Sequence, residues 1–185
     1  MWEKSIVTKD RGISASKQGD LDCLCGAYGL VNMMSYLFDG RVKRRPLMRA
    51  LLKEYGYEWM LDEWLTYGID EDRMDYLIDR ILQHGYYHKH FPTQITQPFK
   101  ENQRLTSKQI LDGMAHYLEY PDSTRVILIS DQYHWSVVTH IDSQYLYFFD
   151  SSGRKKSHIT AYSLLAGASS YQLYPGAIYF VEREF

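Results

Sequence analysis

Two cysteines lie close together near the beginning of the chain, at positions 23 and 25. Cys25 stands where a helical pattern begins, because apolar residues then recur every three or four positions as far as Phe38. A helix start presents unpaired backbone N–H groups and the positive end of the helix dipole, and both favour a thiolate over a thiol. The same N–H groups can hold the oxyanion that forms when a thiolate attacks a carbonyl carbon. Cys25 is therefore the candidate nucleophile, and Gly26 beside it is expected to leave room for a substrate.

Other chemistry for the two cysteines is less favoured. One residue apart, they are poorly placed for a disulfide, and two thiols without nearby His or Cys partners make a poor zinc site. Cys23 lies next to Asp22, whose negative charge disfavours a thiolate, so we interpret Cys23 as structural or auxiliary. Taken alone, a Cys-Gly pair at a helix start is more often structural than reactive. The case for Cys25 thus depends on other residues.

Three further residues could complete a thiol active site. Gln18 lies in a polar and flexible lead-in, residues 14–20, and its side-chain amide could donate to the same oxyanion. His134 opens an apolar strand pattern and Asp150 ends the next one, with a turn at residues 142–144 between them. Pairing about that turn brings Asp150 beside His134, where opposite side chains lie ~5 Å apart. A carboxylate on one imidazole nitrogen orients the ring and leaves the other nitrogen for the thiol.

The remaining histidines form no comparable pattern. His84, His88 and His90 gather near an expected helix end, but no cysteine or pair of carboxylates completes a metal-ligand spacing. His140 and His158 are expected to be structural or exposed. We therefore expect neither a metal nor another cofactor.

Helices come first along the chain and antiparallel strands follow, which predicts an α+β fold. The apolar spacing predicts helices over residues 25–38, 46–56, 70–83 and 106–118. Residues 86–102 are expected to hold one short strand and a loop. Apolar runs predict strands over residues 125–130, 134–141, 145–149 and 177–181, and a short helix is expected from Ala161. With 185 residues we expect one domain, 1–185, with a helical insert at about 45–120.

Composition argues against nucleic-acid and membrane proteins. The formal net charge is −2, and we interpret the basic run at residues 41–45 as a solvated surface. No stretch approaches the ~18 apolar residues of a membrane span, and the first ten residues are too polar for a signal peptide. Free thiols fit a reducing compartment. We therefore expect a cytoplasmic protein. Export as an effector, by a system that reads no cleavable signal, stays open as an alternative.

Two segments of the chain resemble papain-like cysteine peptidases, residues 18–32 and residues 134–150. The resemblance includes the order of four residues: Gln18, Cys25, His134 and Asp150. They are most similar to the peptidase domains of bacteriocin-exporting transporters, the double-glycine peptidases. The resemblance implies a papain-like fold, in which the cysteine helix packs on a C-terminal antiparallel sheet. It also implies an oxyanion residue at Gln18, a nucleophile at Cys25, a general base at His134 and an orienting carboxylate at Asp150.

The reaction implied by this resemblance is cleavage of peptide bonds in a protein or peptide substrate, through an acyl-enzyme intermediate. Deamidation or acyl transfer at a protein glutamine is an alternative. Transglutaminases, acyltransferases and glutamine-deamidating bacterial effectors use a Cys–His pair on related scaffolds. A papain-like module that has lost turnover and only binds a partner is a further alternative.

Overall fold

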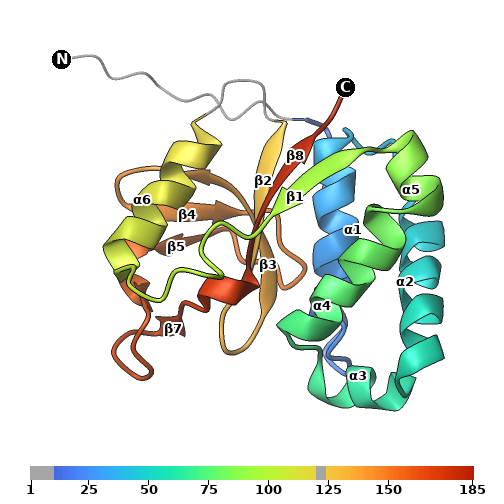
Figure 1. Cartoon of the computed structure of the whole chain (residues 1–185), viewed down its shortest axis with the longest axis horizontal. Coiled ribbons are helices and arrows are strands. Elements are labelled where there is room, and N and C mark those ends of the chain that lie inside the picture. Colours follow the sequence, from blue (N-terminus) through green and yellow to red (C-terminus); the bar gives the residue numbers. More distant parts are fainter. Residues whose placement is uncertain (1–10, 120–123) are drawn as a thin grey trace.

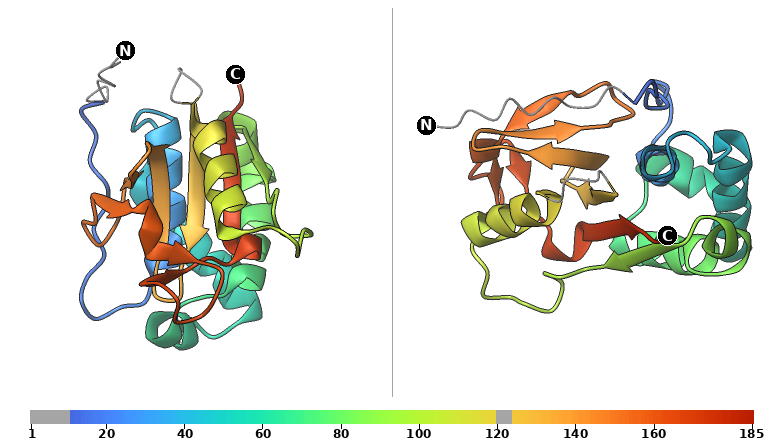
Figure 2. Two further views of the ribbon diagram at one scale, coloured as in Figure 1. Left: turned by 90° about the vertical axis from the view of Figure 1, so that its left-hand side faces the viewer. Right: turned by 90° about the horizontal axis from the view of Figure 1, so that it is seen from above.

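The structure, a computed structural model, describes residues 11–119 and 124–185. Its centre is a six-stranded antiparallel sheet with the strand order β1-β8-β2-β3-β4-β5. Helix α1 (Cys25–Leu37) packs on one face of β2 and β3, and α6 (Ser107–Leu118) packs on the other (Figures 1 and 2). The predicted α+β class is therefore confirmed.

The first half of the chain is mostly helical. After α1 come α2 (Arg44–Glu58), α3 (Leu61–Tyr67), α4 (Glu71–Leu77), a π-helical turn (Ile78–Leu82) and α5 (Gly85–His90). The predicted helix over residues 70–83 corresponds to α4 and the π-helical turn together. Helices α3 and α5 were not predicted, because their 7 and 6 residues are too few to establish a helical period. Assigning residues 86–90 to a strand or loop was therefore wrong.

The strands of the main sheet are β1 (Thr93–Thr96), β2 (Arg125–Ser130), β3 (Trp135–Ile141), β4 (Tyr145–Phe148), β5 (Lys156–His158) and β8 (Ile178–Arg183). Strands β6 (Tyr162–Ser163) and β7 (Tyr171–Gln172) form a small parallel pair. The predicted insert, residues 45–120, is not purely helical, because it contributes β1 to the edge of the sheet. Its last helix, α6, covers a face of that sheet.

The prediction of a short helix from Ala161 is wrong. A 3-10 turn (Ile159–Ala161) leads directly into β6. Tyr162 is buried in the core beneath α6, and Gly167 has a φ of 74°, so the apolar run ends too soon for a helix.

Alternate residues of the central strands fill two different cores. Val126 and Leu128 of β2 face α1, whereas Ile127 and Ile129 of the same strand face α6. A strand buried on both faces is apolar along its whole length, which explains the uninterrupted run at residues 126–129. Within the described ranges, no helix is long and apolar enough to cross a bilayer.

The basic run at residues 41–45 is only partly a solvated surface. Its other cations are exposed, but Arg44 is half-buried. Arg44 donates to the hydroxyls of Ser35 and Ser16 at 3.1 and 3.2 Å and to the Ser14 carbonyl at 2.6 Å. Arg44 thus joins the chain before α1 to the far end of that helix.

Candidate active site

Cys25 is the first residue of α1, as the sequence predicted. The chain enters the helix through Leu24, whose N–H donates to the Asp22 carboxylate at 3.0 Å. Gly26 follows, and a Cβ there would lie 3.0 Å from the Ile69 side chain. The missing side chain therefore allows α1 to pack closely on residue 69. The expectation that Gly26 leaves room for a substrate is wrong.

The segment just before α1 is held by the last turn of α3. The backbone N–H of Cys23 donates to the Leu65 carbonyl at 3.0 Å, and the Cys23 thiol donates to the Thr66 carbonyl at 3.2 Å. The indole of Trp135 donates to the Ile69 carbonyl at 3.0 Å. Cys23 therefore has a structural partner, while Cys25 is placed next to the beginning of β3.

His134 directly precedes β3, and Asp150 lies two residues beyond β4. His134 Nε2 and Asp150 Oδ1 form a hydrogen bond of 2.9 Å, so the contact predicted from the hairpin is present. The Asp150 side chain is 0% exposed. The same carboxylate accepts hydrogen bonds from the N–H of Ser152, at 3.0 Å, and from its hydroxyl.

The Cys25 side chain also lies close enough to the His134 imidazole to help raise its pKa. Because Nε2 is engaged by Asp150, Nδ1 is the nitrogen left for the thiol. The Cys25 sulfur lies 4.0 Å from the Cys23 carbonyl oxygen, too far for that oxygen to hold the thiol strongly. Three residues from distant segments are therefore brought together in the predicted order: thiol, imidazole, carboxylate.

The two charged groups stabilise each other electrostatically. Burial lowers the pKa of His134, but the hydrogen bonds and charges of Asp150 and Cys25 outweigh burial and raise it to about 9. Burial alone would raise the pKa of Asp150, yet hydrogen bonds from His134 and Ser152 hold it well below its ordinary value. At neutral pH the pair is therefore an imidazolium and a carboxylate.

Gln18 lies beside this pair, because its backbone N–H donates to the carbonyl of Ser151 at 3.1 Å. Its side-chain Nε2 donates to the carbonyl of Asp22, in the turn that leads to Cys25. An amide nitrogen carries two hydrogens, so one remains for a substrate oxygen. Gln18 is thus near both halves of the site, although its amide already has a protein partner.

The lead-in that contains Gln18 has specific partners and is not the free segment expected. The N–H of Ser16 donates to Asn32 Oδ1 at 2.7 Å, and Asn32 Nδ2 donates back to the Ser16 carbonyl at 3.1 Å. Asn32 belongs to α1 and is buried. The position of Gln18 is therefore set from the same helix that carries Cys25.

Sequence reasoning missed three polar residues next to the pair. Asp131 accepts a hydrogen bond from the backbone N–H of His134 at 3.0 Å. Arg154 contacts both Asp131 and Ser136. An aspartate followed three residues later by the residue it caps is a recognisable turn pattern. Nothing in the sequence around Arg154 indicated its partners, because Asp131 lies in the turn between β2 and β3 and Ser136 lies on β3.

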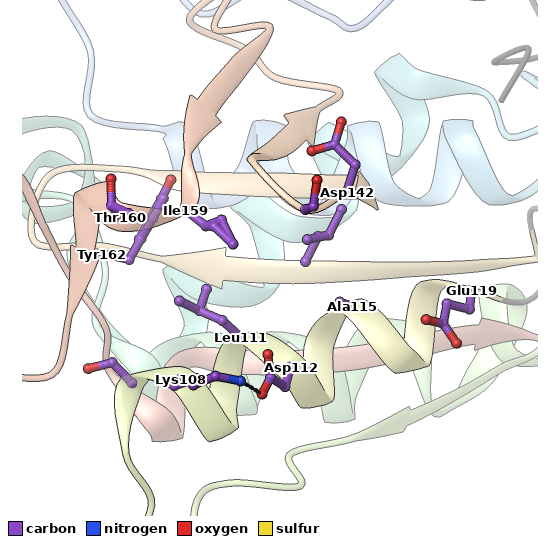
Figure 3. A pocket seen from close by; sticks show the side chains of 12 residues that line it. Lys108, Leu111, Asp112, Ala115, Glu119, Asp142, Ile159, Thr160 and Tyr162 are labelled. Carbon is purple, nitrogen blue, oxygen red and sulfur yellow. Dashed lines mark hydrogen bonds and ion pairs between the residues drawn. The ribbon is translucent and has the colours of Figure 1, made fainter. Parts of the chain in front are cut away.

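A groove of about 640 Å³ lies away from these residues, between α6 and the turn that follows β3 (Figure 3). Leu111 and Ala115 line it from the helix, and Ile141 lines it from the strand. At one end Lys108 forms an ion pair with Asp112. None of the four predicted site residues lines this groove, and α6 lies on the face of the sheet opposite α1.

The described residues contain no group of three or more His, Cys, Asp or Glu that could hold a metal ion. The three clustered histidines, His84, His88 and His90, are exposed. Nδ1 of His84 lies 2.7 Å from the Asp79 carbonyl oxygen, so this ring nitrogen already has a partner.

We compared the chain with family models, with curated proteins and with solved structures, and no match was found in any of the three. Any functional interpretation therefore rests on the geometry of Cys25, His134, Asp150 and Gln18.

Proposed function

We propose that the chain is a papain-like cysteine hydrolase that cleaves peptide bonds, with Cys25 as its nucleophile. The observation that carries this proposal is the position of His134, which bonds Asp150 through Nε2 and contacts the Cys25 side chain as well. The arrangement of elements supports the papain-like fold: a helix that begins at the cysteine packs on an antiparallel sheet that supplies the histidine and the aspartate.

The first half of the reaction forms a thioester. The His134 imidazole takes the proton of the Cys25 thiol, and the sulfur attacks the substrate carbonyl carbon as a thiolate. The carbonyl π electrons move to the oxygen, which accepts hydrogen bonds from the Cys25 N–H and the Gln18 amide. The carbon–nitrogen bond then breaks as the leaving amine takes the proton from His134.

The second half releases the acyl group. A water molecule gives a proton to His134 and its oxygen attacks the thioester carbon. The carbon–sulfur bond breaks, the carboxylic product leaves, and Cys25 is again a thiolate beside an imidazolium. Asp150 keeps its hydrogen bond to Nε2 throughout and stabilises the charged form of the ring.

The proposal is tested with a library of peptides made by digesting a whole proteome, followed by mass spectrometry. Wild type, Cys25→Ser and the matched control Cys23→Ser are each incubated with the library. We expect new peptide termini with wild type and Cys23→Ser, and none with Cys25→Ser. Cys25-dependent conversion of glutamine to glutamate without new termini would replace the peptidase with a deamidase. Termini that persist in Cys25→Ser would overturn the assignment of the nucleophile.

A further inference from the structure

The backbone of His134 is held on both sides by one buried carboxylic residue. Asp131 Oδ1 accepts hydrogen bonds from the N–H of His134 at 3.0 Å and from the N–H of Tyr133 at 2.8 Å. The N–H of Asp131 donates to the His134 carbonyl at 3.2 Å. The Asp131 side chain is only 3% exposed. This turn sets the point from which the imidazole reaches Cys25.

Arg154 is the cationic partner of that carboxylate. Its Nη1 lies 3.3 Å from Asp131 Oδ2, and its Nη2 donates to the Ser136 hydroxyl. The guanidinium carbon lies 4.3 Å from the centre of the Phe148 ring and 5.2 Å from that of Tyr171. A planar guanidinium, with donors in a rigid fork, can serve two acceptors in this way, whereas a lysine ammonium is a single point charge.

Ser136 connects Arg154 to the second half of the pair. It is a buried residue of β3 whose hydroxyl accepts the Arg154 hydrogen bond, and it helps His134 and Ser152 to lower the pKa of Asp150. A hydroxyl can accept one hydrogen bond while it donates another. Arg154 therefore reaches His134 through Asp131 and reaches Asp150 through Ser136.

The charges support the same arrangement. Asp131 and Asp150 are both buried, and two buried carboxylates without compensating cations would be costly. Arg154 contacts Asp131 directly and also interacts with Asp150 through charge. Arg154 and the His134 imidazolium thus provide the positive charges that compensate these two buried carboxylates.

We propose that Arg154 is a positioning residue that fixes the His134 turn and the Asp150 carboxylate relative to each other. Arg154 touches no reacting atom, and its effect on Cys25 passes through Asp131 and Ser136. The inference rests on the proposed function, since it assumes that Cys25 and His134 react as a pair.

The test is the rate at which iodoacetamide alkylates Cys25, measured as a function of pH by mass spectrometry. At about pH 6 a free thiol is protonated and reacts slowly, whereas a thiolate paired with an imidazolium still reacts. We expect Arg154→Met to lower the rate at this pH by about 10- to 100-fold, because small displacements of a reacting pair have effects of this size. Arg154→Lys keeps the positive charge but not the planar set of donors that reaches both Asp131 and Ser136, so we expect an intermediate alkylation rate.

Arg125→Met is the matched control. Arg125 is also half-buried, pairs with Glu182 at 3.1 Å and lies over the Tyr117 ring at 4.9 Å, but it contacts none of the site residues described above. We expect this variant to lose thermal stability and to keep the alkylation profile. An unchanged profile in Arg154→Met would overturn the inference, as would an equal change in Arg125→Met.

Asp131→Asn covers the case in which Arg154→Met does not fold. Its amide oxygen can still accept from the turn N–H groups, while the charge that pairs with Arg154 is lost. We expect a lower alkylation rate at about pH 6, as for Arg154→Met, and an unchanged rate would again overturn the inference. Failure of the proposed function looks different, because wild-type Cys25 would then itself react like a free thiol.

Discussion

The two ends of the β3–β4 hairpin carry similar residues and differ in chemistry. Each end has an aspartate that caps a turn and a histidine near it: Asp150 with His134, and Asp142 with His140. Asp142 accepts hydrogen bonds from the Tyr147 hydroxyl, at 2.6 Å, and from two N–H groups of its own turn. These bonds, the Tyr147 bond above all, hold the pKa of Asp142 below its ordinary value. Asp142 therefore stabilises a turn, whereas Asp150 binds an imidazole.

A third element accounts for the difference. At the Asp150 end, the first turn of α1 brings Cys25 to the imidazole, and the carboxylate is fully buried. At the Asp142 end, the His140 ring packs on Tyr147, with ring centres 5.5 Å apart. A histidine near an aspartate is therefore a weak indication of a site. The helix start that meets them is the informative feature.

Replacement of the proposed nucleophile, which meets only the Asp150 end of the hairpin, should have the largest effect. We expect Cys25→Ser to reduce the cleavage rate of an identified peptide by about 10⁴-fold or more, because the acyl-enzyme no longer forms. Cys23→Ser should keep the rate within about threefold, because a serine hydroxyl can still donate to the Thr66 carbonyl. Equal losses in the two variants would show that the wrong cysteine has been assigned.

Removal of each histidine should give the next largest contrast. We expect His134→Ala to lower kcat/KM by about 10³-fold, in the range for loss of a general acid–base group. His140→Ala at the other end of the hairpin should leave kcat/KM almost unchanged. The comparison fails if the two variants lose activity to a similar extent.

Neutralising each aspartate should have a moderate effect at one end only. We expect Asp150→Asn to lower kcat/KM by about 10- to 100-fold. Because Asp150 raises the pKa of His134, its loss should move the alkaline limb of the pH–rate profile to lower pH. Asp142→Asn should lower the melting temperature and leave the profile where it is. A shift in both variants would show that the effect is not specific to the pair.

The smallest effect concerns stability as a function of pH. The pKa of His134 is raised in the folded chain to about 9, from an ordinary value near 6.5. The stabilisation is therefore complete below about pH 6.5 and is lost as pH rises toward 9. The difference in unfolding free energy between wild type and His134→Gln should fall by about 3 kcal/mol across this window. Urea titrations at several pH values measure it, and a difference independent of pH would contradict the raised pKa.

Much of the sheet and of the His134–Asp150 contact follows from local pattern. The apolar run at residues 125–130 and the turn after Ile141 determine which strands pair, and the count of residues about that turn places Asp150 near His134. Helix capping likewise predicted α6, which opens with Thr106 and Gln109 in the expected reciprocal bonds.

What the sequence did not predict depends on contacts between distant segments. Gly26 was wrongly expected to leave room for a substrate. Ile69 fills the adjacent space, and it comes from the loop between α3 and α4, which is distant in the sequence. Arg154 was missed because its partners, Asp131 and Ser136, lie on the other side of the hairpin. Local periodicity carries no information about such pairs, which form only when the segments pack.

The central claim is that the His134 imidazole lies between Asp150 and the sulfur of Cys25. Its most direct test is an NMR titration of the His134 ring in wild type and in Cys25→Ser. We predict that the wild-type ring titrates at a pKa of about 9, and that loss of the thiol lowers this value, because the thiol side chain contributes to it. A ring that titrates near 6.5 in both proteins would contradict the claim.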